Sequence, residues 1–171
     1  LTSGGVLAFA ATPNFESPAD ADTNNVYSIT ATITDGTNTA TQAITITVTD
    51  VNEAPVITTT AFGSIAENQT AIGTLAATDV DSDTVSFAIT GGDDQGKFTL
   101  SGTTLAFNFS PDFESPADIG TNNVYEVQIT ATDDGTGALT DVETVSVTVI
   151  SVNEAPVITT TAFGSIAENQ T

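Results

Sequence analysis

The sequence predicts an all-β protein, built as an immunoglobulin-like Greek-key β-sandwich in tandem repeats. Short strand signals recur at regular spacing with turn residues between them, and no stretch shows a sustained helical period. A block of twenty residues, VNEAPVITTTAFGSIAENQT, occupies positions 51–70 and returns letter for letter at 152–171. Self-similarity at a fixed period is typical of arrays of similar modules.

The strand signals fall in order along one repeat. Strands are expected at 55–60, 71–78, 85–90, 98–100, 104–109, 124–132 and 142–151. The last two alternate most cleanly: Val127, Ile129 and Ala131 share one face, and polar residues occupy the other. Because each strand then has one apolar and one polar face, two antiparallel sheets packed face to face are expected.

The repeat extends well beyond the identical block. LAFAATPNFESPADADTNNVYSITATITDG, at 7–36, parallels LAFNFSPDFESPADIGTNNVYEVQITATDDG, at 105–135. We therefore expect residues 1–52 to form the C-terminal half of a repeat, 53–153 a complete repeat, and 154–171 the first strand of the next. This division predicts that the chain is a segment of a longer secreted repeat protein.

The composition excludes several classes of function. The chain has no cysteine and no histidine, and Lys97 is its one basic residue against 22 acidic ones, for a net charge of -21. Disulfides, thiol nucleophiles and cysteine zinc sites are therefore absent. Binding to nucleic acid or to anionic membranes needs cationic side chains, and insertion into a membrane needs an apolar run of ~18 residues, which this sequence lacks.

The acidic residues gather in loops between the expected strands. The clusters are Asp50–Glu53, Glu67–Asn68, Asp79–Asp83, Asp112–Glu114 and Asp133–Asp134. Any one of them alone is ordinary for a solvated loop. A sandwich, however, collects its loops at two ends, and two carboxylates ~5 Å apart at an effective dielectric of ~20 repel by roughly 3 kcal/mol. A hard, oxygen-preferring cation would relieve this repulsion, and calcium is the expected ion.

One cluster begins like the calcium loop of helix–loop–helix proteins. DVDSDT, at 79–84, supplies alternate aspartates, but its sixth position is Thr84 rather than glycine and its twelfth is Thr90 rather than glutamate. Strands are also expected on both sides of it. This spacing therefore predicts two ligands for one ion, outside a helix–loop–helix site.

Five motifs together resemble a known family. VTDVNEAP before a strand, AEN after it, ATDVDSD, PDFE and YEVQITATDDG occur in the order typical of cadherin-like repeats, and the bacterial form found in large surface adhesins is the most similar. The resemblance implies an extracellular location and calcium bound at the junctions between consecutive repeats. It implies neighbouring identical or similar repeats as partners.

The resemblance also implies ligands for two junctions. At the first junction, Asn14 stands where the family has aspartate, beside Glu16. The set implied for the first junction is Glu16, Asp50, Asn52, Glu53, Glu67, Asp79, Asp81 and Asp133. The set implied for the second junction is Asp112, Glu114, Asn153, Glu154 and Glu168. Because Ser151 replaces the linker aspartate there, the second site is expected to be weaker.

The predicted function is a calcium-rigidified spacer of an extracellular adhesin or of a surface or matrix fibre, without catalysis. A sandwich supplies no evident cleft for the paired acids of glycoside cleavage. Two alternatives stay open: an adhesion module that binds glycans or its own kind, and a filament subunit completed by strand donation between neighbours. Nothing in 1–52 or 154–171 corresponds to 71–99, which favours the excised segment over strand donation.

Overall fold

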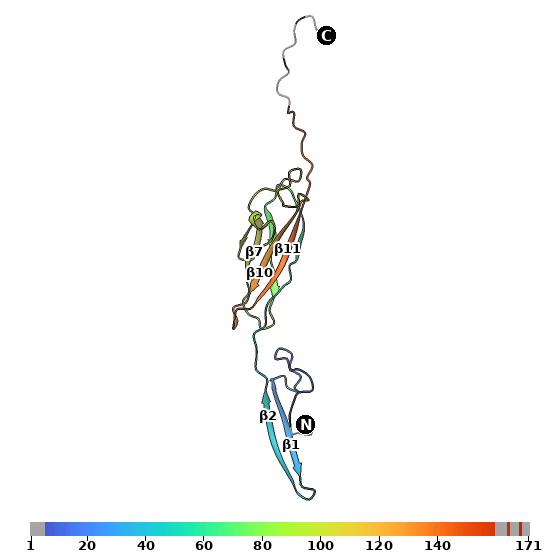
Figure 1. Ribbon diagram of the computed structural model, residues 1–171, viewed down its shortest axis with the longest axis vertical. Coiled ribbons are helices and arrows are strands. Elements are labelled where there is room, and N and C mark those ends of the chain that lie inside the picture. Colours follow the sequence, from blue (N-terminus) through green and yellow to red (C-terminus); the bar gives the residue numbers. More distant parts are fainter. Residues whose placement is uncertain (1–5, 160–163, 165–167, 169–171) are drawn as a thin grey trace.

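The computed structural model describes residues 6–159 together with residues 164 and 168, and it confirms the all-β prediction. The molecule is long and narrow, with a two-stranded hairpin followed by a sandwich (Figure 1). The hairpin strands are β1 (Val26–Thr34) and β2 (Thr39–Thr47). The later strands are β3 (Val56–Ile57), β4 (Ala61–Ala66), β5 (Ala71–Thr74), β6 (Ala77–Thr78), β7 (Ser86–Gly91), β8 (Phe98–Ser101), β9 (Thr104–Phe107), β10 (Val124–Thr132) and β11 (Thr140–Ile150), with one 3-10 turn, η1 (Gln95–Lys97).

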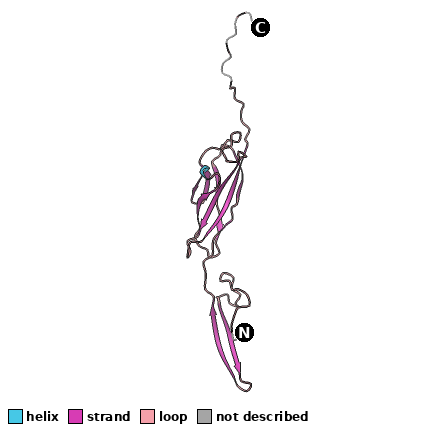
Figure 2. Cartoon of the chain, in the orientation of Figure 1, coloured by secondary structure: helices cyan, strands magenta, loops and turns pink. Residues whose placement is uncertain are grey.

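The sandwich contains one four-stranded sheet, in the order β4-β11-β10-β7. The strands that complete it are the three-stranded sheet β5-β9-β8 and the short pair β3-β6. Strands dominate the chain, and long loops connect them (Figure 2). In the sheet, β10 pairs antiparallel with both β7 and β11, whereas β4 runs parallel to β11.

The core lies between these layers and comes from the alternating strands. Val127, Ile129 and Ala131 of β10 are fully buried, as the sequence pattern predicts. Aromatic rings fill the end of the core, where Phe107 and Tyr125 meet edge to face at 5.1 Å between centroids. The other buried apolar residues are Ile57, Leu75, Phe98, Leu105, Val145, Val147 and Val149.

The predicted strands differ from the observed ones at one main point. The observed β10 and β11 lie within two residues of the prediction, but β4 falls in the interval 61–70 where no strand was expected. Within β4, Gly63 has a φ of +68°, and the pairing with β11 shifts register between Ser146 and Thr148. A bulged strand of this kind carries no period-2 pattern.

The hairpin β1–β2 repeats the geometry of β10–β11. Tyr27 lies opposite Ile46, as Tyr125 lies opposite Val147. The hydroxyl of Tyr27 accepts a hydrogen bond from the Ala19 amide at 3.1 Å, and the hydroxyl of Tyr125 accepts one from the Ala117 amide at the same distance. The hairpin thus has the strand register and the Tyr corner of the sandwich pair.

The C-terminal segment differs from the expectation of a strand. Residues 154–159 form no strand, and most of the remaining expected strand lies outside the described residues. Within the described part of the chain, no helix is long and apolar enough to cross a membrane.

Candidate metal centre at the junction

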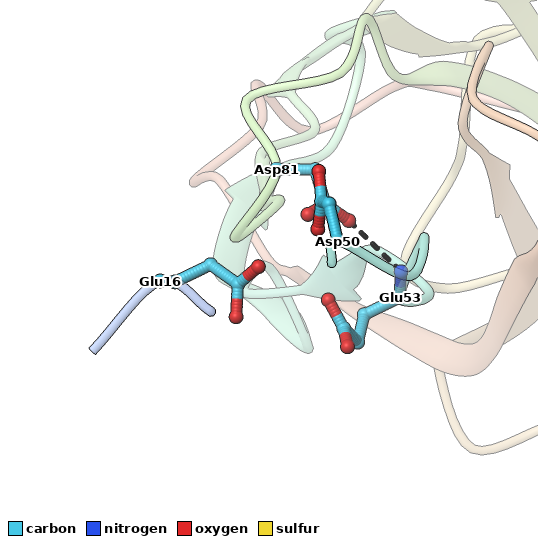
Figure 3. A group of neighbouring side chains, drawn as sticks. All are labelled: Glu16, Asp50, Glu53 and Asp81. Carbon is cyan, nitrogen blue, oxygen red and sulfur yellow. Dashed lines mark hydrogen bonds between the residues drawn. The ribbon is translucent and has the colours of Figure 1, made fainter. Parts of the chain in front are cut away.

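Four carboxylates from three segments of the chain meet beside the linker between hairpin and sandwich. Each of these side chains offers an oxygen within 4.8 Å of the others, and no basic side chain belongs to the group. Figure 3 shows them gathered around one small region, with only the Asp81 carboxylate bonded to a backbone amide. The group comprises Glu16 before β1, Asp50 and Glu53 in the linker, and Asp81 between β6 and β7. We call it the linker group.

The loop that carries Asp81 is held by its own aspartates. Asp81 Oδ2 accepts a hydrogen bond from the Glu53 amide at 2.8 Å, which ties the linker to the loop. Asp79 Oδ1 accepts from the amides of Asp81 at 2.9 Å and Asp83 at 3.4 Å. Aspartate side chains commonly hold such turns by bonding the backbone two residues on. The turn places Asp79, Asp81 and Asp83 in a second group of close carboxylates that shares Asp81 with the first.

A second loop, after β10, closes over the same region. Asp133 is buried, and its Oδ2 accepts a hydrogen bond from Asn52 Nδ2 at 3.2 Å. At Gly135 a side chain would collide with the side chains of Asn52 and Asp83, so the loops approach more closely than a Cβ allows. A hollow of about 620 Å³ between the loops is lined by Asp50, Asn52, Asp81, Asp83 and Gly135, among others.

Two oxygens in this region are buried and lack a hydrogen-bond partner. They are Asp79 Oδ2 and Asp81 Oδ1. Buried polar atoms are normally paired, so an unpaired carboxylate oxygen calls for a partner such as an ion. The donor atoms present are carboxylate and amide oxygens, which are the ligands that calcium prefers. The residues therefore fit a calcium ion.

The electrostatics of the region favour uptake of positive charge. Desolvation raises the pKa of Glu53, and the charges of Glu16, Asp81 and Asp50 raise it further. Desolvation likewise raises the pKa of Asp83, aided by the neighbouring aspartates, first among them Asp79. Both pKa shifts therefore have the same two causes, which are desolvation first and uncompensated negative charge nearby second.

A third group lies at the opposite end of the sandwich and contains Glu67, Asp112 and Glu114. The Glu67 side chain is only 2% exposed, and its oxygens accept hydrogen bonds from the amides of Phe113 at 2.9 Å and Val152 at 2.6 Å. These two bonds lower the pKa of Glu67. We call this set the distal group.

The position of Glu67 corrects the sequence analysis, which assigned it to the first junction. Because β4 runs parallel to β11, both strands end at the same end of the sandwich. The Glu67 amide accordingly donates to the carbonyl of Ile150 at 2.9 Å, at the end of β11. Glu67 therefore lies with Asp112 and Glu114, at the end of the sandwich next to Val152.

The remaining predicted residues of the second junction are less closely gathered. Glu154 Oε1 accepts from Asn68 Nδ2 at 3.5 Å, and Asn153 and Glu168 are exposed. Among the described residues, neither Glu154 nor Glu168 joins a group of three acidic side chains. At the first junction, the Asn14 side chain accepts from the Ser17 amide at 2.7 Å.

Sequence reasoning missed two acidic residues of the first junction. Asp83 belongs to the second group of carboxylates, and Asp134 Oδ1 accepts from the Thr84 amide at 2.7 Å. The signals were present, since Asp83 continues the alternate spacing of Asp79 and Asp81, and Asp134 follows Asp133 directly.

Comparisons with known proteins identify the fold. No family model and no curated protein matches the chain. Among solved structures, the chain resembles extracellular cadherin domains 1–4 of protocadherin gamma B7, with a TM-score of 0.55 and 21% identity over 80% of this chain and 34% of that one. It resembles domains EC1-3 of protocadherin gamma C5, with a TM-score of 0.54 and 24% identity over 77% of this chain and 46% of that one. Domains EC22-24 of mouse cadherin-23 match with a TM-score of 0.51 and 21% identity over 80% and 45% of the two chains.

These likenesses establish a cadherin-like fold. The chain spans between about a third and a half of the length of these solved structures.

Proposed function

We propose that the chain is a calcium-rigidified spacer of an extracellular adhesin or surface fibre, with calcium bound at the junctions between repeats. The observation that supports it most directly is the linker group, whose carboxylates come from the hairpin part, the linker and the sandwich and lie within 4.8 Å of one another. An ion held there contacts both sides of the linker at once. We propose the domain division 1–52, 53–153 and 154–171 with it.

Without calcium, the linker group is a source of repulsion. Two unit charges 4.8 Å apart repel by about 1 kcal/mol in water and by about 3 kcal/mol at an effective dielectric of ~20. The hairpin and the sandwich can reduce this repulsion by swinging apart about the linker. The calcium-free junction is therefore expected to sample many angles.

With calcium, the same oxygens become ligands. Calcium takes six to eight oxygens, and Asp79, Asn52 and Asp133 offer further ones beside the linker group. Sites in extracellular modules bind with dissociation constants of about 10⁻⁴–10⁻³ M. At a hundred times its dissociation constant, an ion stabilises the bound form by about 2.7 kcal/mol. The junction would then be stiff only where calcium is plentiful, outside the cell.

The distal group supports a second site of the same kind. Glu67, Asp112 and Glu114 offer three carboxylates at the end of the sandwich that faces residues 152–154. In place of a linker aspartate this end has Ser151, whose hydroxyl bonds to Glu114 at 3.4 Å. We propose that this site is weaker than the first, because the linker contributes less negative charge.

Calorimetric titration with calcium tests the proposal. The Asp81→Ala substitution removes the residue that two carboxylate groups share. We expect it to weaken calcium binding at the first junction by about 10-fold or more, because even the loss of a residue that only supports a metal ligand commonly has an effect of this size. Asp93→Ala is the matched control, because Asp93 is exposed and belongs to none of the acidic groups. Equal affinities for the two variants, or no calcium binding by the parent chain, would refute the proposal.

A further inference from the structure

Strand β7 forms an open edge of the four-stranded sheet. It pairs with β10 on one side, and no strand among the described residues pairs with its other side. The pairing with β10 is regular from Ser86 to Ile89 and shifts register only beyond Ile89. Edge strands in natural proteins are usually protected by charged residues, proline or a bulge. Over its regular stretch, SFAI, β7 has none of these, so its main chain is open to pairing with another strand.

An apolar hollow of about 560 Å³ opens beside this edge. β7 lines it with Phe87 and Ile89, and β8, the edge strand of the three-stranded sheet, lines it with Phe98 and Leu100. Phe98 belongs to the buried core, whereas Phe87, Ile89 and Leu100 pack against the core and are only partly buried. The hollow therefore leads from solvent towards the core between the edges of two sheets, and part of its apolar lining is in contact with water.

The absence of charge distinguishes this edge within a very acidic chain. The hollow is lined only by residues from 85–89 and 98–103, and the sequence carries no charged residue over 84–92 or 98–111. The net charge of the chain is -21, so two copies repel each other wherever their acidic loops meet. At this edge a basic partner would find no opposite charge, and a second copy would meet no like charge. The edge therefore suits a partner that offers an uncharged strand with apolar side chains, and a second copy offers both in β7 itself.

We propose that β7 pairs antiparallel with β7 of a second copy of the chain, about a two-fold axis at Phe87. Residues directly opposite each other in a sheet share a face, so a shift of one residue would set inward-facing side chains against outward-facing ones. Among the registers that match the faces, the one centred on Phe87 joins the most residues of the regular stretch without using any residue beyond Ile89. It places Phe87 opposite Phe87, Ser86 opposite Ala88, and Val85 opposite Ile89.

This register matches the side chains on both faces of the sheet. On the inner face, the two Phe87 rings meet at the axis, and a pair of Val85 with Ile89 lies on each side of them. Aromatic and β-branched pairs across antiparallel strands stabilise a sheet. Because all three side chains line the hollow, pairing would cover apolar surface that faces water in the single molecule. On the outer face, Ser86 and Ala88 are exposed and uncharged, so they can lie opposite each other.

The symmetry of this contact limits the assembly to two molecules. Both copies use the same strand, so the interface is isologous and closed. Antiparallel pairing points the two chains in opposite directions, and the hairpin lies beyond one end of the sandwich (Figure 1). The two hairpins therefore lie at opposite ends of the pair and do not obstruct it. The product is two sandwiches side by side, whose four-stranded sheets join into one sheet of eight strands.

Acidic residues beyond the two ends of β7 limit the affinity. Asp83 precedes the strand and Asp93 follows it, and antiparallel pairing brings Asp83 of each copy towards the end of β7 that Asp93 follows in the other. Dissolved salt screens such repulsion between exposed charges. We therefore expect the association to strengthen with added salt. None of residues 85–89 belongs to a group of acidic side chains, so the pairing itself does not need calcium.

Paired charge substitutions at Ser86 and Ala88 test the proposal and its register. Sedimentation of the full chain is measured in chelator and about 0.15 M salt, from about 10 µM to about 1 mM protein. The parent should change from monomer to dimer as its concentration rises. Ser86→Asp combined with Ala88→Asp sets like charges opposite each other twice, about 5 Å apart, and should weaken association roughly 10-fold or more. Ser86→Lys combined with Ala88→Asp sets opposite charges there at an unchanged net charge, so it should associate at least as tightly as the parent.

A mixing experiment separates pairing at β7 from the overall charge of the chain. Ser86→Lys combined with Ala88→Lys makes the chain less negative, yet it should also associate weakly, because like charges again lie opposite each other. Mixed with the doubly acidic variant, it should form one-to-one dimers, which requires that both variants are folded. A parent that stays monomeric up to about 1 mM would instead assign this edge to a strand of another protein. That result, or equal association of the doubly acidic and the oppositely charged variants, would overturn the proposal.

Discussion

At the scale of single residues, the pKa values of acidic side chains shift in opposite directions at the two ends of the sandwich. Glu67 is bonded by two backbone amides, and this lowers its pKa, so its negative charge is stabilised. Desolvation, and after it the charges of acidic neighbours, raises the pKa values of Glu53 and Asp83. Glu53 and Asp83 therefore resist ionisation, whereas Glu67 does not, and a cation near Glu53 and Asp83 would stabilise their charged forms.

The pH dependence of the calcium-free chain follows from these directions. A carboxyl group whose pKa is higher in the folded state than in the unfolded state contributes stability at low pH and loses it as the pH rises through the folded value. We therefore expect the melting temperature in chelator to rise as the pH falls from 7 towards the usual carboxyl range near 4. It should fall again at lower pH, as Glu67 takes up a proton through its lowered pKa and loses its two backbone bonds.

The Asp83→Asn substitution separates two roles of Asp83, which are repulsion of its acidic neighbours without calcium and binding of calcium when the ion is present. It should raise the calcium-free melting temperature at pH 7, because it removes one charge from a crowded group, and it should weaken calcium binding roughly 10-fold. Melting curves and calcium titrations of the same samples measure both effects. Asp93→Asn, outside the groups, should change neither. A lower calcium-free melting temperature for Asp83→Asn would contradict this account of the repulsion.

At the scale of strands, how well an element could be predicted depends on whether its side chains alternate. In β10 buried and less buried residues alternate along the whole strand, and in β11 polar and apolar residues alternate from Thr144 to Val149, so the sequence places both strands closely. In β4 the pattern is broken by Gly63 and by a register shift, and its pairing with β11 is a contact between residues distant in the sequence. The same parallel pairing fixes the end of the sandwich at which Glu67 lies, whereas the sequence analysis placed Glu67 at the first junction from the resemblance alone.

The candidate site could likewise be predicted only in part, because its residues follow local motifs but the contacts between its loops do not. Sequence motifs identified most of the acidic residues, because D-x-D and D-x-E spacings are local. They could not show which loops meet. The contact between Asn52 and Asp133 spans the linker and the loop after β10, and it depends on the close approach at Gly135.

Corresponding positions in the sandwich and in the segment before β1 offer a matched test of packing. Leu105 is fully buried and its counterpart Leu7 is 41% exposed. We expect Leu105→Ala to lower the free energy of unfolding of the sandwich by about 2–5 kcal/mol, the usual result of deleting a large core side chain. Leu7→Ala should cost less than about 1 kcal/mol. Denaturant unfolding in chelator measures both, and equal losses would show that the hairpin face is as well packed as the core.

At the scale of the whole molecule, the chain is elongated (Figure 1), and calcium is proposed to decide how far it bends at the linker. The sandwich has a continuous core of its own, whereas its connection to the hairpin is the linker with its acidic side chains. We thus assign the stiffness of the connection between hairpin and sandwich to the carboxylate oxygens of the linker group.

The most direct test measures the spread of distances across the junction. Because the chain has no cysteine, spin labels can be attached at Thr47→Cys and Ser86→Cys, one on each side of the linker group. Pulsed electron resonance should give a broad distance distribution in chelator and a narrow one in saturating calcium, with Asp81→Ala staying broad in both. A distribution of unchanged width on adding calcium to the parent chain would contradict the central claim that calcium stiffens this junction.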